Sequence, residues 1–283
     1  MLLGAHLSIA GGMENALIKA HRYAFDTVAV FVRNQRQWYA PPLEEPAAEL
    51  FRGTRRELGI SPVIAHGSYL VNLSGRPDVR GRSIAATAEE LDRCGRLGIE
   101  YLVIHPGSHP DARAGLRLVA EALNEVLAAC PHRRPIILLE TTAGQGNSLG
   151  RTFEQLSAIL DLVRDPGRFG VCLDTCHVFA AGYDIRTPKA YRKVMDELNG
   201  VVGEGRLRVV HVNDSLKGLG SRVDRHAHVG RGCIGLKGLA NFVNDPRLAA
   251  LPMILETPKG LDARGRDWDQ VNAKTLRRLV RPA

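Results

Sequence analysis

Histidine and carboxylate side chains end a series of short apolar segments in this sequence. The segment FGVCLD (169–174) ends in Asp174, and His177 follows three residues later. The same arrangement recurs at five further segments, which end in or close to His66, His105, Glu140, His211 and Glu256. Loops then add Asp224 and His226. One apolar strand that ends in an ionisable side chain can arise by chance, but six of them indicate a shared site.

Together these positions give nine potential metal ligands, of which five are histidines, two are aspartates and two are glutamates. Each has an ordinary structural explanation alone, such as a hydrogen-bonded histidine, a turn-capping aspartate or a glutamate paired with arginine. Nine buried ionisable groups without a counter-charge, however, would be very costly. Divalent ions supply that charge, and a His/carboxylate set without Cys suits zinc, manganese or iron. With bridging carboxylates the set matches about two or three ions, an arrangement that hydrolyses phosphate esters.

Eight apolar, β-branched segments must position these side chains. They are LLGAH (2–6), TVAVFVR (27–33), PVIAH (62–66), YLVIH (101–105), PIILLE (135–140), FGVCLD (169–174), LRVVHVND (207–214) and PMILET (252–257). The stretches between them carry apolar residues at helical spacing, and Gly98 is a candidate helix C-cap. Eight alternating units predict a (β/α)₈ TIM barrel, whose strand C-termini all lie on one face. A doubly wound open sheet is the alternative, although no G-x-G-x-x-G follows the first segment.

Length and composition fit one enzyme domain. The 283 residues are close to the ~250 of a single barrel, and without a low-complexity linker we interpret residues 1–283 as one domain. The sequence has no run long enough for a membrane span and no signal-peptide pattern, so we expect a cytoplasmic protein without membrane association. Because no interface pattern is evident, we also expect a monomer. Five scattered cysteines do not suggest disulfides, and we interpret Cys172 and Cys176 as packing residues. A net charge of +8 favours an anionic partner, nucleic acid first.

Nine motifs resemble the endonuclease IV family of apurinic/apyrimidinic (AP) endonucleases, in the family's order. They are GAHLSIAGG, NQRQW, HGSYLVNLS, VIHPGSH, LLETTAGQGNSLG, CLDTCHVFAAGYD, HVNDS, GSRVDRHAHVG and ILETP. The resemblance runs from about residue 2 to 258 and implies a (β/α)₈ barrel with three zinc ions per chain, manganese being an alternative at the third site. It also implies a partition among the ions. His66 and His105 hold the first zinc, and Glu140 bridges to the second. Asp174, His211 and Glu256 complete the second site. The third site consists of His177, Asp224 and His226, so that a short turn after Asp174 lets one strand end serve two ions.

The resemblance also implies the reaction. The substrate would be double-stranded DNA that contains abasic or 3′-blocked lesions. The bond cut would be the phosphodiester 5′ to the abasic site, which leaves a 3′-hydroxyl and a 5′-deoxyribose phosphate. Glu140 and Glu256 are the implied catalytic residues, because they would position a hydroxide between the first two zincs and tune its basicity. The third zinc would stabilise the departing oxygen.

Two loops carry residues suited to opening a duplex. NQRQW (34–38) contains Arg36, and SYLVN (68–72) contains Tyr69 and Leu70. A lesion must be turned out of the helix before a metal cluster in a barrel mouth can reach it. An aromatic or aliphatic wedge beside an arginine kinks DNA from the minor groove. The resemblance therefore implies that Arg36, Tyr69 and Leu70 contact DNA.

Other positions carry less specific expectations. We expect Trp38 to pack under its loop, and His6 to hydrogen-bond to a ligand rather than to bind metal. His109 and His228 lie next to ligands, and we assign neither to the site. Relatives usually carry an acid where this sequence has Arg231, so that Arg231 is a candidate additional DNA contact. Loop position predicts phosphate contacts from Ser8, Lys217, Arg222 and Arg225.

Two other functions compete with this interpretation. A metal-dependent sugar isomerase or epimerase also uses His, Asp and Glu at barrel strand ends, but the nine ligands, the basic charge and the NQRQW loop argue against it. A non-catalytic DNA-binding protein with structural zinc is the second rival. Structural zinc favours closed, Cys-rich sites, whereas this set has carboxylates and no Cys.

Overall fold

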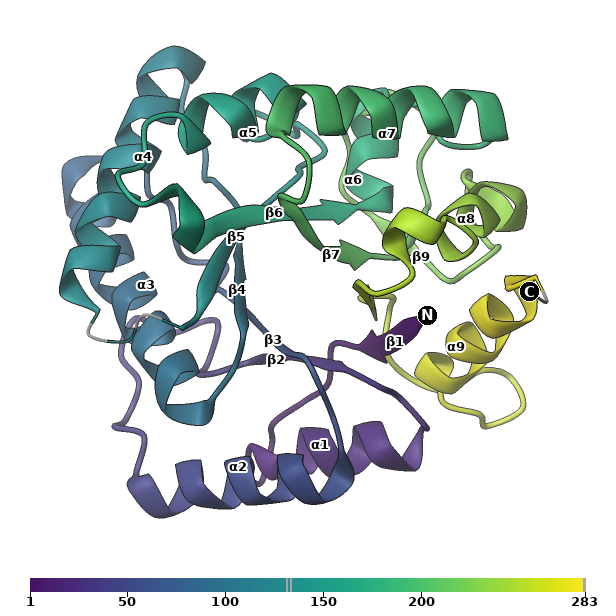
Figure 1. Cartoon of the computed structure of the whole chain (residues 1–283), viewed down its shortest axis with the longest axis horizontal. Helices are drawn as coiled ribbons and strands as arrows, with labels where there is room; N and C mark the ends of the chain where they lie inside the picture. Colours follow the sequence, from purple (N-terminus) through teal and green to yellow (C-terminus); the bar gives the residue numbers. More distant parts are fainter. Residues whose placement is uncertain (131, 133, 282–283) are drawn as a thin grey trace.

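Eight parallel strands form a closed barrel in the computed structural model, which describes residues 1–130, 132 and 134–281 (Figure 1). The barrel strands are β1 (Leu2–Ala5), β2 (Val28–Phe31), β3 (Val63–His66), β4 (Tyr101–Ile104), β5 (Ile136–Glu140), β6 (Phe169–Asp174), β7 (Leu207–His211) and β10 (Pro252–Leu255). Hydrogen bonds join them in the order β1-β10-β7-β6-β5-β4-β3-β2, and every neighbouring pair is parallel. A parallel bridge between His6 and Ala29 then links β1 to β2. The predicted (β/α)₈ barrel is confirmed, and the open doubly wound sheet is wrong.

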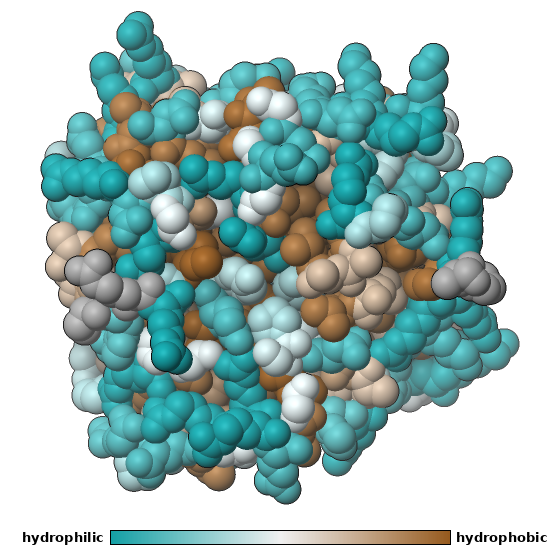
Figure 2. All heavy atoms as spheres, in the orientation of Figure 1, coloured by the Kyte–Doolittle hydropathy of each residue, from teal (hydrophilic) through white to brown (hydrophobic). Residues whose placement is uncertain are grey.

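Helices surround the barrel on its outside, as Figure 1 shows. They are α1 (Glu14–Arg22), α2 (Glu45–Leu58), α3 (Pro77–Leu97), α4 (Ala112–Ala129), α5 (Phe153–Leu160), α6 (Thr175–Ala181), α7 (Pro188–Val202), α8 (Gly235–Val243) and α9 (Trp268–Leu279), with short 3₁₀ turns η1 (Pro166–Arg168) and η2 (Pro246–Leu248). The predicted cap Gly98 ends α3 with a left-handed φ of 72°, which favours glycine. Hydrophilic side chains cover most of the face drawn in Figure 2, and apolar residues gather nearer its middle. Across the described residues, no helix combines the length and apolar character needed to cross a membrane.

The barrel interior is built in layers. One apolar layer holds a side chain from each of seven strands: Ala29, Ile64, Val103, Leu138, Cys172, Val209 and Ile254. Because strand side chains alternate between faces, the residues two positions further along point into the same interior. Those residues are Phe31, His66, His105, Glu140, Asp174, His211 and Glu256. The apolar layer therefore forms the floor beneath the predicted ligands. Cys172 belongs to this layer, and its burial raises the pKa of the thiol to about 12. A neutral, buried thiol agrees with the packing role predicted for Cys172.

The predicted strand 207–214 is too long. Strand β7 ends at His211, three residues earlier than predicted, and the Asn213 backbone N–H donates to the Thr175 hydroxyl at 2.9 Å instead of to a neighbouring strand. The chain then forms β8 (Asp214–Ser215), which pairs antiparallel with β9 (His226–Ala227) in a hairpin over the barrel mouth. The buried Asp214 carboxylate holds the segment beyond this hairpin by accepting backbone N–H groups of Ser215, Gly230, Gly232, Ile234 and Gly235.

Candidate metal centre

Glu140 lies at the centre of the predicted ligands. Its carboxylate is fully buried at the end of β5. Glu140 Oε2 is 3.1 Å from Nε2 of both His66 and His105. Glu140 Oε1 is 2.9 Å from Nδ1 of His211 and 3.4 Å from Nδ1 of His177. One carboxylate thus faces four imidazoles, and this donor set could hold divalent cations.

A second group adjoins Glu140 on the side of β6, β7 and β10. His211 Nδ1 is 3.1 Å from Glu256 Oε2 and 4.0 Å from Asp174 Oδ2. Ligand atoms of Glu140, Asp174, His211 and Glu256 all lie within 4.8 Å of one another. These side chains come from the last residues of β5, β6 and β7 and from the residue directly after β10, so the barrel itself fixes their separation. Three carboxylates around one imidazole form a strongly anionic cavity that fits a divalent ion.

The third group lies nearer to solvent. His177 Nε2 is 3.1 Å from Asp224 Oδ2, and His226 Nε2 is 3.6 Å from Asp224 Oδ1. Asp174 Oδ2 is also only 3.5 Å from His226 Nε2. Ligand atoms of Asp174, His177 and His226 lie within 4.8 Å of one another. Asp174 therefore touches both the second and the third group, which the sequence analysis did not anticipate.

Helix α6 brings His177 back to Asp174. The predicted short turn between them is the first turn of α6, which begins directly after β6 and runs for seven residues. The Asp174 side chain is its N-cap and accepts the His177 backbone N–H at 2.8 Å. One carboxylate thus ends a strand, caps a helix and faces the ligand cavity.

Backbone carbonyls fix the orientation of three imidazoles. Nδ1 of His66, His177 and His226 donates to the carbonyl oxygens of Gly67, Thr141 and Glu256, at 2.9, 2.8 and 3.0 Å. Since a carbonyl only accepts, Nδ1 carries the proton and Nε2 points its lone pair at the cavity. Within the described residues, the buried Nε2 atoms of His177 and His226 have no hydrogen-bond partner. Lone pairs that face carboxylate oxygens need a cation between them, so the donor set fits divalent metal ions.

The pKa values of the cluster also indicate that it needs bound positive charge. Burial opposes a charge on His177, but Asp174, Asp224 and Glu140 outweigh it and raise the pKa well above its usual value. The pKa of His211 is also raised well above its usual value, against burial, by the neighbouring carboxylates of Glu256 and Glu140. Burial likewise opposes ionisation of Glu140, yet the imidazoles hold its pKa well below the ordinary range. In the absence of metal the cluster therefore binds protons in place of cations.

Two side chains outside the ligand set support it. Nδ1 of His6 lies 3.1 Å from Glu256 Oε1, so the predicted hydrogen bond from His6 to a ligand is confirmed. Asn213 was missed by the sequence analysis. Its Nδ2 donates to Asp174 Oδ2 at 2.6 Å, and its Oδ1 accepts the Glu256 backbone N–H at 2.8 Å. The sequence offered one clue to Asn213, because it is an amide side chain that lies two residues after the predicted ligand His211.

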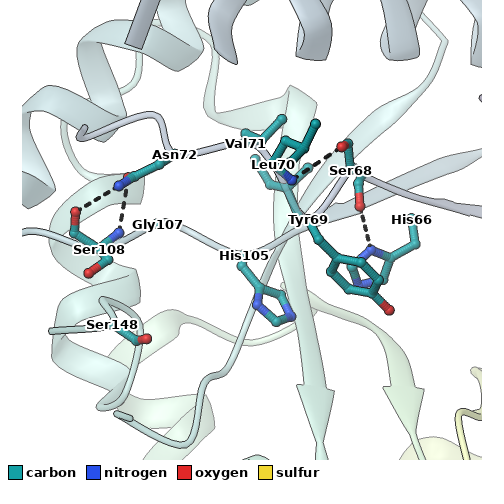
Figure 3. A pocket seen from close by; sticks show the side chains of 12 residues that line it. His66, Ser68, Tyr69, Leu70, Val71, Asn72, His105, Gly107, Ser108 and Ser148 are labelled. Atoms are coloured by element: carbon teal, nitrogen blue, oxygen red, sulfur yellow. Dashed lines mark hydrogen bonds between the residues drawn. The ribbon is translucent and has the colours of Figure 1, made fainter. Parts of the chain in front are cut away.

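Tyr69 stands between two cavities at the mouth of the cluster. It is 65% exposed, and its ring centroid lies 5.9 Å from that of His66. Figure 3 shows Tyr69 beside His66 with His105 directed into the smaller cavity, which has a volume of about 280 Å³ and which Leu70 also lines. The larger cavity, of about 780 Å³, is lined by Tyr69, by Arg36 and by the predicted ligand Glu256. The predicted DNA-contacting residues thus lie around the metal cluster.

The other predicted positions are more scattered. Ser8 lines the larger cavity, whereas Lys217, Arg222 and Arg225 lie on the β8–β9 loop, outside the two cavities that meet at Tyr69. Trp38 is half-buried under the Arg82 guanidinium, 5.0 Å from the ring centroid, in agreement with the predicted packing. The Arg231 guanidinium stacks 4.7 Å over the ring of Trp268. Arg231 is therefore held against α9, and its contact with DNA stays a prediction.

Comparison with known proteins gives one matching family model and three similar proteins. The family model of xylose isomerase-like TIM barrels matches residues 17–279. A probable endonuclease 4 of Chloroflexus aurantiacus is 48% identical over 283 residues, which cover 99% of this chain and 98% of the relative. The crystal structure of endonuclease IV from Thermus thermophilus superposes with a TM-score of 0.89 at 38% identity, over 99% of this chain and 98% of that one. A D-psicose 3-epimerase of Clostridium cellulolyticum covers both chains fully with a TM-score of 0.70, but its 16% identity indicates a shared fold alone.

Proposed function

This chain belongs to the endonuclease IV family of AP endonucleases, within the xylose isomerase-like TIM barrels, and on that premise we propose that it cuts the phosphodiester 5′ to abasic sites with a trinuclear zinc centre. The products are a 3′-hydroxyl and a 5′-deoxyribose phosphate, and the same site removes blocked 3′ ends. Residues 1–283 act as one AP endonuclease domain. The observation that carries the proposal is the buried Glu140 carboxylate with four imidazole nitrogens within 3.4 Å.

The three side-chain groups correspond to three ion sites. His66 and His105 would hold the first ion with Glu140 as the bridge to the second. Asp174, His211 and Glu256 would complete the second site. His177, Asp224 and His226 would hold the third, where manganese is an alternative to zinc. Asp174 Oδ2 lies 3.5 Å from His226 Nε2, which suggests that Asp174 also contributes to the third ion.

Bound divalent ions supply a hydroxide at neutral pH and neutralise the charge of the leaving oxygen. The protein contributes rigid placement of the acids around them. Glu140 is fixed between imidazoles of β3, β4 and β7, and Glu256 is held by His6 at 3.1 Å. Glu140 and Glu256 are the catalytic carboxylates, because Glu140 belongs to both of the first two groups and Glu256 to the second, where they would orient the attacking water. The apolar layer below them, which includes Leu138 and Ile254, keeps bulk water out from the barrel side.

The substrate is DNA, as for an endonuclease. Arg36 and Tyr69 line the larger cavity beside Glu256, and Leu70 lines the smaller one beside His66. We assign these three residues to the wedge that enters the duplex at the lesion. Ser8, Lys217, Arg222 and Arg225 contact phosphates. The enzyme acts as a monomer in the cytoplasm, where chromosomal DNA of a bacterium lies.

Metal analysis combined with a cleavage assay tests the proposal. The purified protein should carry about three ions per chain and should cut a duplex with one abasic site immediately 5′ to the lesion. The control duplex without the lesion should stay intact, and chelator should abolish cutting. Conversion of keto-sugars without DNA cleavage would instead favour the epimerase alternative. Tight binding of DNA without cleavage at any metal load would favour a structural role for the ions.

A further inference from the structure

Four buried or half-buried charged side chains lie under the loop that contains Arg36 and the loop that contains Tyr69. They are Arg33, two residues after β2, together with Glu89, Glu90 and Arg93 of α3, and we call them the α3 clamp. The side chains of Arg33 and Glu90 are each only 1% exposed, and that of Arg93 is 9% exposed. The clamp lies outside the metal cluster, and the proposed reaction does not use it.

The two arginines of the clamp hold the loop that contains Arg36. Arg33 donates from Nη2 to the carbonyl oxygens of Gln37 and Trp38, at 2.5 and 2.6 Å. Arg93 donates to the carbonyl of Val32 at 3.3 Å and to that of Pro41. Glu89 links the two arginines, since it accepts from Arg33 Nη1 at 2.6 Å and from Arg93 Nη2 at 2.8 Å. Both ends of residues 32–41 are therefore fastened to α3.

Glu90 and Ser68 hold the loop that contains Tyr69 and Leu70. Glu90 Oε1 accepts the Ser68 backbone N–H at 3.1 Å and lies 3.9 Å from Arg33 Nε. The Ser68 hydroxyl then donates to the Gln35 carbonyl at 2.8 Å and accepts the Leu70 N–H at 3.2 Å. Ser68 is thus a direct crosslink between the two loops, and Glu90 fastens the crosslink to the clamp.

Stability alone does not account for this arrangement. Within the described residues, Arg33 Nε and Glu90 Oε2 lack hydrogen-bond partners. Buried ion pairs with unsatisfied atoms are often no more stabilising than apolar residues of the same volume. Apolar side chains in place of the clamp residues could not form hydrogen bonds with four backbone carbonyls of one loop and a backbone amide of the other. The clear effect of the clamp is to fix those loops relative to each other.

We propose that the α3 clamp and its Ser68 crosslink make residues 34–38 and 68–72 one rigid unit, so that Arg36, Tyr69 and Leu70 enter DNA together. This inference rests on the proposed cleavage of lesion-containing DNA. Ser68 and Glu90 are accordingly positioning residues. A preordered wedge avoids the entropic cost of fixing each loop on binding. Loss of the crosslink should weaken duplex binding and leave the chemistry at the metal centre unchanged.

A double-mutant cycle tests the coupling. In the wild-type background, Arg36→Ala and Tyr69→Ala should raise KM for an abasic duplex non-additively, with a coupling of about threefold to tenfold. In the Ser68→Ala background the same pair should become additive, while Ser68→Ala alone raises KM about tenfold. Hydrolysis of a small activated phosphodiester, which needs no wedge, should keep its kcat in Ser68→Ala. Thr87→Val is the matched control, because it removes a buried α3 hydroxyl that bonds only within its own helix.

A second measurement does not depend on DNA. Amide hydrogen exchange of Ser68→Ala should increase in residues 34–38 as well as in 68–72, although the substitution lies in only one loop. Glu90→Gln should give the same pattern and is the alternative if Ser68→Ala folds poorly. Unchanged exchange in 34–38, or coupling that persists in Ser68→Ala, would overturn the inference. If wild-type protein fails to cut an abasic duplex, the proposed function fails, and the exchange data still decide whether the loops are coupled.

Discussion

Loading the metal-stripped protein with zinc should release protons. Without metal, the pKa values of His177 and His211 are raised well above the usual range, and the pKa of His66 is raised as well. At pH 7 the raised pKa values favour the protonated form of the first two imidazoles strongly, and that of the third to a smaller extent. Metal binds only the neutral imidazole. Filling the sites at pH 7 should therefore release about two to three protons per chain.

The number of released protons also determines how the zinc affinity depends on pH. Overall zinc affinity should fall by about two to three powers of ten for each pH unit below 7. The sign for stability follows from the raised imidazole pKa values. In the metal-free protein these histidines contribute stability that is complete below the unfolded pKa of about 6.5 and is lost as the pH rises through the folded value. The metal-free protein should thus lose stability above neutral pH, where the loaded protein is most stable.

Titration calorimetry in two buffers of different ionisation enthalpy measures the released protons directly. His109→Ala is the matched control, because His109 bonds locally to Asp111 and should leave the count unchanged. Zinc binding without proton release would refute the assignment of these imidazoles as ligands. Release of a similar number from a variant that lacks both His177 and His211 would refute it equally.

Four substitutions test other parts of the site. Glu140→Gln should bind an abasic duplex within about threefold of wild type in a gel-shift assay but should lose at least about 10³-fold in single-turnover rate, and full activity would remove the bridging role. Asp214→Asn should lower the unfolding free energy by about 2 kcal/mol and lose the ion nearest Asp224 first, as read by urea melts and metal analysis; retention of all ions at wild-type stability would contradict this. Burial, opposed by Arg33, raises the pKa of Glu90 to about 7, so its contribution is complete below the unfolded pKa and is lost as the pH rises through 7. The stability of wild type relative to Glu90→Gln should therefore fall by up to about 3 kcal/mol between about pH 4.5 and 8, and a constant difference in urea melts would refute the shift. Cys172→Ala should keep its full metal content, since the pKa of the Cys172 thiol is raised to about 12; loss of an ion would make that thiol a ligand.

Much of the site could be predicted because a parallel barrel imposes it. All strand C-termini meet on one face, and alternation along each strand directs every second residue inward. His66, His105, Glu140 and Asp174 follow from these two rules alone. Their positions depend on the backbone and not on the details of side-chain packing.

The errors and omissions share a physical cause. The hairpin at Asp214, the helix start at Thr175 and the amide of Asn213 depend on side-chain hydrogen bonds between distant segments. Such hydrogen bonds leave no periodic pattern in the sequence from which they could be predicted. The α3 clamp is a clearer case, since Arg33 and Glu90 lie far apart in the sequence and each alone resembles an ordinary charged residue. Only the fold brings them together under the loops.

Anomalous diffraction at the zinc edge, from crystals of the zinc-loaded protein, tests the central claim most directly. We predict about three peaks inside the barrel mouth, one within each of the three ligand groups, with Glu140 between the first two. Peaks confined to the protein surface would contradict this account, as would an empty mouth in which the same imidazoles and carboxylates contact each other without ions.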